Sequence, residues 1–488
     1  MNASPRFPDI AEEPEPPAAD HAPGLERAFA ARPAERNGAV CQIEGRIPHY
    51  ARGTYYLNGP ARFQRGALRY RHWLDGDGMV AALRLSPTGA SLSCRFVRGE
   101  KLAAEDEADA PLFRAFGTGF PEDRLVRGIA LASPVNVSVY PFAGRLLAFG
   151  EQGLPWELDP ATLATRGPYT FGGALNPVSP FAAHPKIDPE TGELWNFGVS
   201  FSATQPSLNL YRFTPEGVLL ARRRHPLPFP CSLHDFCLSA RHAIFYISPY
   251  VLDMESFAAG DTLLDALTWE PEHGSRLLVL DRETGELTAN IPVGEGYCLH
   301  GINAWEQGNR LAVDILELER PVYDQYKVPD LFPQVAPGGP VRFVIDLATG
   351  QLAERTASIY RGAPDFPAID PRRYGQRTDD VWMLGISKTG QAGRKFFDQL
   401  VHADLAEPER QEIWQAPPGS YLAGEPAFLP DTDSDQDGAV LVPLYDAGRH
   451  STEFLLFDAF DLAAGPQAVL TPEAPLHLAF HAVFAPDA

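Results

Sequence analysis

From about Gln42 to its end, the chain consists of short β-rich segments separated by turn residues. Typical segments are YYLNGP, LNLYRF, RLLVLD, VRFVID and EFLLFD, and 47 proline and 42 glycine residues interrupt them. Long amphipathic helical periodicity is nearly absent. Short apolar runs bounded by Gly, Pro and Asp are typical of strands, so the pattern predicts an all-β fold.

One turn sequence recurs in four segments. They are LDPATLAT from Leu158, IDPETGEL from Ile187, LDRETGEL from Leu280 and IDLATGQL from Ile345. The Asp side chain can cap such a turn, and glycine supplies the positive φ where a strand reverses. We expect a hairpin at a sheet edge in each case. Repeated hairpins favour a β-propeller, with about 65 residues per blade for seven blades, although paired β-sandwiches or a β-helix stay open at this point.

The first 35 residues have a different character. Proline and acidic residues dominate up to Pro23, and the stretch GLERAFAARPAER allows only a turn or two of helix. The sequence therefore predicts a flexible N-terminal arm with a short helix in residues 1–35. A single propeller domain is predicted for residues 36–488.

The charge balance argues against nucleic acid as a partner. The chain has 41 Lys and Arg residues against 63 Asp and Glu, which gives a formal net charge of −22. Binding to a phosphate backbone or to anionic lipid needs a basic face. An apolar patch still allows peripheral contact with a membrane.

The cysteines and the N-terminus indicate a cytoplasmic protein. None of the five cysteines forms a CxxC pair, so a disulfide scaffold or a structural zinc cluster is disfavoured. The chain begins without a basic and apolar leader, and no apolar run reaches about 18 residues. We expect reduced thiols and no transmembrane helix.

Four histidines are the candidate site residues. The chain has no GxSxG, P-loop or HExxH motif. His184, His234, His300 and His481 each lie at or within an apolar strand-like stretch, where an imidazole prefers to be neutral and can bind a metal. They lie 50, 66 and 181 residues apart, so only a fold that gathers strand ends on one axis brings them together. Taken singly, each is better explained as a core histidine, and the case for a metal rests on the four together. Four imidazoles without a carboxylate suit Fe, Cu, Ni or Zn.

At these residues the sequence resembles the carotenoid cleavage oxygenase family. The similarity extends from about residue 45 to 485 and runs in family order. It includes LNGPARF from Leu57, HWLDGDGMV from His72, LLAFGEQGLPWELDP from Leu146, AHPKIDPETGEL, LHDF, HGINAWE, AGEPAFLP from Ala423 and the final FHAVF.

The resemblance implies a seven-bladed propeller with a dome of loops and helices over an axial metal site. It implies a non-haem Fe(II) held by His184, His234, His300 and His481, and O2 as co-substrate. The reaction it implies cleaves a C=C bond into two carbonyl products. It also assigns carboxylates that orient the ligands, at Glu151, Glu425 and Asp365, and a valine that screens an open position, at Val137 in PVNVSVY. Asp365 stands where glutamate is common, one methylene shorter, so we expect it to need backbone adjustment or a water to reach its histidine.

The resemblance leaves the substrate between two classes. Stilbene-cleaving relatives typically carry a lysine just before the first orienting glutamate, and here that residue is Gly150. This favours an apolar polyene, a carotenoid or apocarotenoid, over a stilbene. A retinoid isomerase and a non-catalytic carotenoid-binding propeller are further alternatives.

Residues 249–269 are the expected membrane contact. This segment reads PYVLDMESFAAGDTLLDALTW, and in the family its neighbourhood belongs to an apolar patch around the channel mouth. We expect Val251, Leu252, Phe257, Leu263, Leu264 and Leu267 to form such a patch. The alternative is a helix packed on the propeller.

Overall fold

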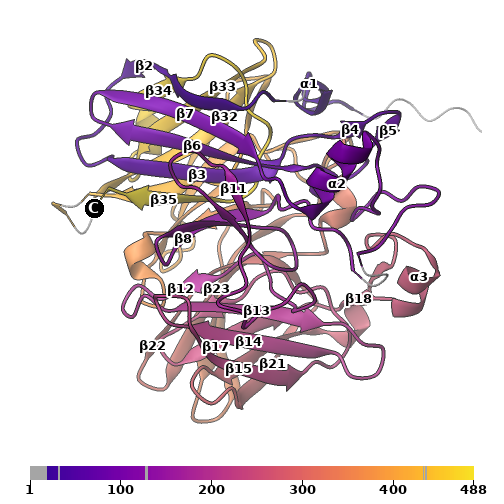
Figure 1. The fold of residues 1–488 in the computed structure, drawn as a ribbon. Coiled ribbons are helices and arrows are strands. Elements are labelled where there is room, and N and C mark those ends of the chain that lie inside the picture. Colours follow the sequence, from indigo (N-terminus) through magenta and orange to yellow (C-terminus); the bar gives the residue numbers. More distant parts are fainter. Residues whose placement is uncertain (1–18, 31–32, 127–129, 432, 435–436, 488) are drawn as a thin grey trace, which may run out of the picture.

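The computed structural model describes residues 19–30, 33–126, 130–431, 433–434 and 437–487. Within these residues, strands make up nearly all of the regular structure, and seven sheets contain four to six strands each. The sheets are the blades of a seven-bladed β-propeller (Figure 1). The predicted all-β propeller is therefore confirmed, and the β-sandwich and β-helix alternatives are excluded.

Four blades come from consecutive stretches of the chain between Ser138 and Ala357. They are β8 (Ser138–Phe142), β9 (Arg145–Phe149), β10 (Trp156–Leu158) and β11 (Thr165–Pro168); β12 (Lys186–Ile187), β13 (Leu194–Ser200), β14 (Ser207–Phe213) and β15 (Leu219–Pro226); β16 (Cys237–Leu238), β17 (His242–Ile247), β20 (Ser275–Asp281) and β21 (Leu287–Gly294); and β22 (Tyr297–Gln307), β23 (Arg310–Leu318), β24 (Gly338–Asp346) and β25 (Gln351–Ala357). Each is an antiparallel sheet of sequential strands.

A fifth blade has the same form, and the last two combine strands from both ends of the chain. The fifth is β26 (Asp365–Ala368), β27 (Asp380–Gly385), β28 (Gln399–Asp404) and β29 (Gln411–Gln415). The sixth contains β30 (Ser420–Leu422), β31 (Ala427–Pro430), β32 (Gly438–Asp446), β33 (Ser451–Asp458), β34 (Ala468–Thr471) and β2 (Gln42–Gly45). The seventh contains β1 (Arg36–Val40), β7 (Gly89–Phe96), β6 (Gly78–Ser86), β3 (Gly53–Pro60) and β35 (Ala482–Pro486).

Two strand pairings close the ring. Strand β2 pairs with β34, and β3 pairs with β35, so N-terminal and C-terminal strands share sheets. The first strands of neighbouring blades also contact one another: β16 with β22, β22 with β26, β31 with β35, and β35 and β3 with β8. These inner strands surround the axis, and the residues just before or within them are brought together there.

The hydrophobic core lies between the blades. One cluster joins Ile302 and Leu316 of one blade to Val381 and Val401 of the next. The outer strand β21 shows why such strands form, because Ala289, Ile291 and Val293 are buried while the residues between them are exposed. This period of two gives each blade a face that packs on its neighbour.

The four recurring turns are all hairpins, as predicted. In each, the Asp carboxylate accepts backbone N–H groups two and three residues ahead. Gly192, Gly285 and Gly350 have φ values of +70°, +74° and +65° at the reversal. The turn without glycine places Leu163 at φ +58°. Its buried side chain packs between blades and holds this less favourable backbone.

The helices lie together on one side of the molecule. Figure 1 shows α1 (Glu26–Ala30), α2 (Glu100–Ala108) and α3 (Met254–Ala259) on its right-hand side, near the ribbon β4 (Gln64–Arg65) and β5 (Leu68–Arg69) and near β18 (Tyr250–Leu252), which pairs with β19 (Leu267–Trp269). Single 3₁₀ turns occupy Trp73–Asp75, Pro271–His273, Tyr323–Gln325, Pro371–Arg373 and Leu462–Ala464. In the described part of the chain, no helix has the length and apolar character needed to cross a membrane.

The N-terminal arm falls mostly outside the described residues, which begin at residue 19. Helix α1 packs on the propeller side, where the Phe29 ring lies 5.1 Å from that of Phe63. The division of the chain into an arm (1–35) and one propeller domain (36–488) stays a prediction.

Candidate metal centre

Four histidines from four blades meet at the inner strands. His184 precedes β12, His234 precedes β16, His300 lies in β22 and His481 precedes β35. One ring nitrogen from each histidine lies within 4.8 Å of those of the other three, and the Nε2 atoms of His184 and His234 are 2.8 Å apart. The structure therefore brings together all four histidines that the sequence singled out.

The histidines are buried, and the surroundings of three of them favour neutral rings. Burial and the neighbouring imidazoles hold the pKa of His184 well below its usual value, and burial lowers the pKa of His481 to about 3. Burial also lowers the pKa of His300, although Asp365 opposes it. At His234 burial acts in the same direction, but Glu151 outweighs it and raises the pKa. Neutral imidazoles present lone pairs that can bind a metal.

The three predicted carboxylates lie behind three of the histidines. Glu151 Oε1 is 2.8 Å from His234 Nδ1, Asp365 Oδ1 is 2.5 Å from His300 Nδ1, and Glu425 Oε1 is 3.4 Å from His481 Nδ1. An acceptor at Nδ1 fixes the proton there and leaves Nε2 free as a ligand atom. His184 has no carboxylate partner among the described residues.

Asp365 reaches its histidine directly despite its short side chain. The 2.5 Å contact leaves no room for a bridging water. The next residue, Phe366, has φ +54°, and its N–H donates to Asp365 Oδ1 at 2.9 Å. The contact is direct, so a bridging water is not needed, and the backbone beside it has a positive φ at Phe366.

Two tyrosines complete the carboxylate contacts, and the sequence analysis missed both. Tyr323 OH lies 3.3 Å from Glu151 Oε1 and 3.1 Å from His234 Nδ1, and Tyr326 OH donates to Asp365 Oδ2 at 3.3 Å. Both belong to the stretch PVYDQYKVPD between β23 and β24. The only sequence signal was a pair of tyrosines three residues apart, which is one turn of helix and no specific motif.

Val137 lies beside His481 through its backbone. Its carbonyl accepts the His481 N–H at 3.3 Å, and its side chain belongs to the main core cluster with 1% exposure. The role of Val137 as a screen beside an open position stays a prediction.

The donor set fits a metal ion. His300 Nε2 is buried and has no hydrogen-bond partner in the part of the chain that the structure describes. Because His234 Nδ1–H donates to Glu151, the His234 Nε2 lone pair points toward His184 Nε2, 2.8 Å away, and is available to a metal. Four imidazoles with no anionic ligand suit a first-row transition metal and leave coordination positions open.

Two cavities lie near the histidines. One is lined by His184, His300 and His481, and the other reaches the site through Glu151, the partner of His234. The helix-side cavity has a volume of about 470 Å³ and is lined in part by Phe116, Leu131, Glu151, Phe201, Leu252 and Phe257. The axial cavity has a volume of about 310 Å³ and is lined in part by Tyr140, His184, His300, Tyr374, Glu425 and His481. The helix-side cavity is within the size range of small-molecule sites, and most of its lining is apolar.

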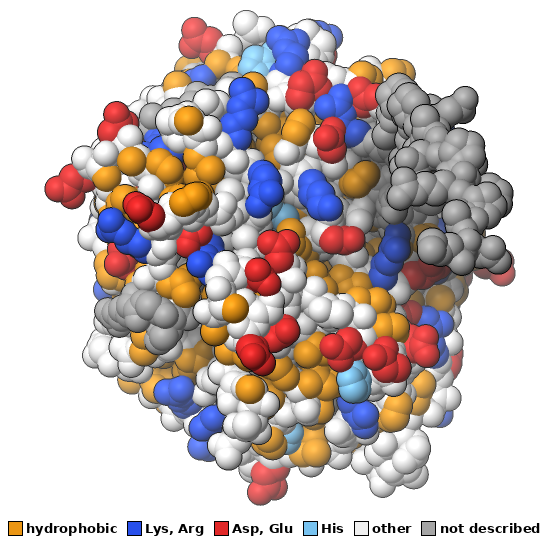
Figure 2. Space-filling model, turned by 90° about the vertical axis from the view of Figure 1, so that its right-hand side faces the viewer, with side chains coloured by type: hydrophobic (Ala, Val, Ile, Leu, Met, Phe, Trp, Pro, Cys, Tyr) orange, Lys and Arg blue, Asp and Glu red, His pale blue; other side chains and the backbone are white. Residues whose placement is uncertain are grey.

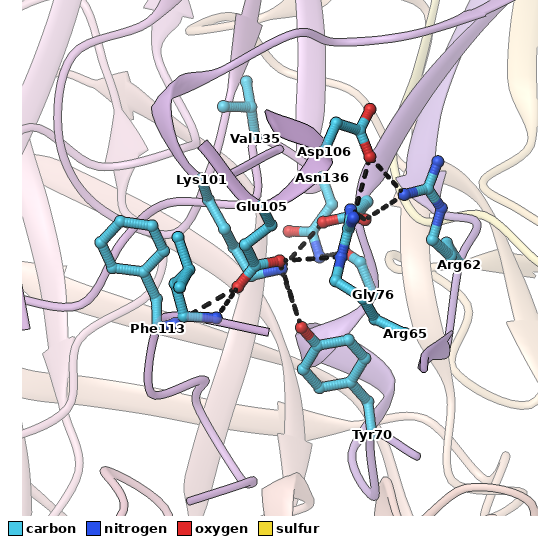
Figure 3. Close-up of polar contacts among 12 residues, drawn as sticks. Arg62, Arg65, Tyr70, Gly76, Lys101, Glu105, Asp106, Phe113, Val135 and Asn136 are labelled. Carbon is cyan, nitrogen blue, oxygen red and sulfur yellow. Dashed lines mark hydrogen bonds and ion pairs between the residues drawn. The ribbon is translucent and has the colours of Figure 1, made fainter. Parts of the chain in front are cut away.

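A buried ion cluster supports one wall of the helix-side cavity. It consists of Arg62, Arg65, Lys101, Asp77, Glu105 and Asp106 (Figure 3). Lys101 lines the cavity, and its Nζ lies 2.8 Å from Asp77, 2.9 Å from Glu105 and 3.2 Å from Tyr70 OH. Glu105 also accepts the N–H groups of Leu112 and Phe113, which fixes the loop that leads to Phe116.

Gly150 has no space for a side chain. A Cβ atom at this position would lie 2.0 Å from Ser133 Oγ and 3.3 Å from Val135 N. Ser133 and the neighbouring Glu151 both line the helix-side cavity. The wall beside Glu151 therefore carries the hydroxyl of Ser133 where a lysine at position 150 would begin.

The apolar side chains of the segment 249–269 are mostly packed against the rest of the protein and are not fully exposed to solvent. None of the six expected patch residues is fully exposed: Leu252 is buried, and Leu263, Leu264 and Leu267 pack against the main core. Leu252, Phe257 and Leu263 line the helix-side cavity. Figure 2 looks onto the helix-bearing side, where apolar side chains are interspersed with charged ones.

Comparison with known proteins adds a family and several relatives. The model of the retinal pigment epithelial membrane protein family matches residues 29–486. Apocarotenoid-15,15'-oxygenase from Synechocystis sp. is 29% identical over 466 residues, which cover 91% of this chain and 92% of that protein. Resveratrol cleavage oxygenase 1 from Aspergillus fumigatus is also 29% identical over 466 residues, which cover 90% of this chain and 91% of that protein.

A solved structure gives the same likeness. Cobalt-substituted apocarotenoid oxygenase from Synechocystis aligns with a TM-score of 0.87 and 26% sequence identity, and the match covers 96% of this chain and 100% of that chain. The similarity thus extends over the whole propeller.

Proposed function

The chain belongs to the retinal pigment epithelial membrane protein family of carotenoid- and stilbene-cleaving oxygenases, and we propose that it is a non-haem Fe(II) dioxygenase that cleaves a C=C bond of a carotenoid or apocarotenoid. The products are two aldehydes or ketones, with one oxygen atom of O2 in each. The observation that carries the proposal is the buried group of four histidines, which can hold a metal. Three of them line the axial cavity, and the fourth, His234, contacts Glu151 in the wall of the helix-side cavity.

The residues of the site have two roles: some would hold the metal, and others position the metal ligands or the substrate. His184, His234, His300 and His481 would hold the iron, which when bound supplies the one-electron chemistry that allows O2 to react with an alkene. Glu151, Asp365 and Glu425 keep the Nδ1 protons in place, so that each Nε2 remains a ligand. The walls of the helix-side cavity exclude water and fix which double bond lies beside the site.

The polyene preference rests on the wall beside Glu151. Ser133 Oγ occupies the space next to Gly150, so this wall offers no cation to a phenol or phenolate. The only lysine that lines the helix-side cavity within the described residues is Lys101, and its ammonium already contacts Asp77, Glu105 and Tyr70. An apolar chain loses less hydration on entering such a cavity than a hydroxystilbene does.

The substrate class is tested by incubating the Fe(II)-loaded protein in air with a long apocarotenal and with a hydroxystilbene, in parallel. Mass analysis of the products should give aldehydes from the apocarotenal and identify the cleaved bond. Aldehydes from the hydroxystilbene alone would retain the oxygenase and overturn the polyene preference. An isomerised product without cleavage would indicate the isomerase alternative.

The metal site is tested by removing one ligand at a time. His300→Ala should bring turnover to background, because three imidazoles would bind the iron more weakly and would hold it less precisely than four. His402→Ala is the matched control, since His402 is also a largely buried histidine but pairs with Asp380 outside the site. A His300→Ala variant with near-normal turnover would refute the assignment.

Peripheral membrane contact through residues 249–269 is a further part of the proposal. It is supported by Leu252, Phe257 and Leu263, which line the cavity that an apolar substrate must enter. Replacing Leu263 and Leu264 with serine should reduce sedimentation with phosphatidylcholine vesicles. Unchanged sedimentation would show that these leucines serve only to pack the segment on the core.

A further inference from the structure

Asp235 joins three of the strand ends that carry the histidines. It follows His234 directly, and its side chain is 3% exposed. Asp235 Oδ1 contacts Lys186 Nζ at 2.8 Å, and Oδ2 accepts the N–H of Gly301 at 3.0 Å. Lys186 follows His184 by two residues, and Gly301 follows His300 by one. One carboxylate therefore contacts the segments of three different blades immediately beside their candidate ligands.

The local backbone is arranged to supply these contacts. The pairing of β22 with β23 changes register on both sides of Gly301, so the strand is irregular at this residue. An irregularity of this kind frees a backbone N–H from the ladder and makes it available to a side chain. Asp235 Oδ1 also accepts the N–H of Phe236 at 2.8 Å, which fixes the direction of the carboxylate.

Close packing beside the carboxylate gives a second, independent indication. A Cβ atom at Gly301 would lie 2.4 Å from Cys237 Sγ and 3.7 Å from Asp235 Oδ2. Glycine thus allows β16 and β22 to approach closely behind the histidines. The distance between the backbones that carry His234 and His300 is held by this contact and by the Asp235 bond together.

The other carboxylates cannot set this spacing. Glu151, Asp365 and Glu425 each contact the ring of one histidine and orient that ring. The fourth histidine is held in another way, because His481 forms backbone hydrogen bonds with Asn58 and Val137 at the ring closure. The spacing of the other three histidines depends on a link between the blades that contain strands β12, β16 and β22.

We propose that Asp235 is a positioning residue that sets the spacing of His184, His234 and His300 by bonding to Lys186 and to the backbone of Gly301. This inference rests on the proposed function, because it assumes that the histidines bind a metal. Asp235 touches neither the metal nor the substrate in this assignment and acts through the backbone positions of the ligands.

The test is a Co(II) titration of the full-length protein, followed by visible absorption, with a competing chelator to obtain the affinity. Asp235→Asn keeps the size of the side chain and an acceptor for Gly301, but it removes the charge that Lys186 contacts. We expect Co(II) binding to weaken at least about tenfold, with a changed absorption band, in line with the effect of residues that support metal ligands. Turnover of the Fe(II)-loaded variant should fall as well.

Asp188→Asn is the matched control. Asp188 forms a similarly buried ion pair with Arg282 between the same two blades, at 2.6 Å, but neither residue adjoins a candidate ligand. Asp188→Asn should leave Co(II) affinity and the absorption band unchanged. Equal losses in both variants would mean that Asp235 contributes only general stability, and this would overturn the proposal.

A second variant keeps the proposal testable if Asp235→Asn folds poorly. Lys186→Met should also weaken Co(II) binding, and the double variant should bind no worse than Asp235→Asn alone, because both changes break the same link. Additive losses, or parent-like affinity in Lys186→Met, would contradict it. If the parent protein turns over substrate and Asp235→Asn has the same turnover and Co(II) affinity, the positioning role alone is refuted. If the parent protein binds no Co(II), the proposed function is refuted as well.

Discussion

At the scale of single residues, the candidate ligands differ in what lies behind them. His234, His300 and His481 each have a carboxylate near Nδ1, whereas His184 has none among the described residues. Asp365, whose pKa His300 lowers against the effect of burial, supplies negative charge near a metal that has no anionic ligand of its own, whereas burial raises the pKa of Glu425 to about 8. The contact of Asp365 with His300 is the shortest of the three, so this pair should be the most sensitive to substitution.

Asp365→Asn should weaken metal binding by about 10- to 100-fold, because the neutral amide is a poorer acceptor for the His300 Nδ1 proton. The measurement is Co(II) affinity by chelator competition. Asp380→Asn is the control, since Asp380 contacts His402 Nε2 at 2.7 Å in an equivalent pair outside the site. Equal affinities for Asp365→Asn and the parent would mean that Asp365 has no effect on the ligand.

Glu306 gives a prediction about pH. Burial alone would raise the pKa of Glu306, but hydrogen bonds from His242, Ser239 and Arg241 outweigh burial and lower the pKa to about 2. A depressed carboxyl pKa stabilises the fold above the unfolded value of 4.5, and this stability is lost as the pH falls from 4.5 toward 2.

Glu306→Gln should therefore lower the free energy of unfolding at pH 7 by about 2 kcal/mol, a figure reduced for the exposed position of Arg241. The difference from the parent should persist at pH 5 and shrink near pH 3. Urea unfolding at the three pH values measures it, with the exposed Glu407→Gln as control. A difference that stays constant down to pH 3 would exclude the ionised carboxylate as its source.

At the scale of elements, regular hairpins were predictable and buried polar packing was not. An Asp side chain that caps a turn acts within a few residues, so the turns at Asp188, Asp281 and Asp346 could be read locally. Helix α2 is different, because its sequence EKLAAEDEA is rich in charge and yet Lys101 and Glu105 are buried. Their burial depends on Arg65 and Asp77, which no local pattern connects to the helix.

Lys101→Met should lower the free energy of unfolding by about 3 to 5 kcal/mol, because it removes one of the two cations that the buried Asp77 and Glu105 share and leaves only Arg65 between them. Urea unfolding at neutral pH measures the change. Lys388→Met, at an exposed lysine, should stay close to the parent. A loss below about 1 kcal/mol would show that the arginines compensate for Lys101.

At the scale of the whole molecule, the propeller, the four histidines and the three carboxylates near them could be predicted, but the two tyrosines and the packing of residues 249–269 could not. The motifs around His184, His234, His300 and His481 identified the residues, and the ring of blades supplies the geometry. Tyr323 and Tyr326 were missed because they lie on a connection whose path only the structure gives. The segment 249–269 was expected as a surface patch, and its leucines proved to be partly covered because apolar composition alone does not distinguish a core-facing loop from an exposed one.

Metal binding should stabilise the entire fold, since four blades contribute to one site. With free Co(II) at 100 times its Kd, the free energy of unfolding should rise by about 2.7 kcal/mol. Urea unfolding with and without Co(II) measures this rise. His300→Ala should show a much smaller rise, and an equal rise in that variant would place the bound cobalt elsewhere.

The buried ion cluster has a consequence for how this protein can change over generations. Its three cations and three anions share contacts, so a single substitution removes an ion contact from at least two other members of the cluster. We therefore expect the residues that support the wall with Lys101 and Phe116 to be inherited together. Other lining residues, at 177–180 and at Phe257 and Leu263, are not members of the ion cluster. New substrate preferences in descendants of this chain would arise there, one tolerated substitution after another.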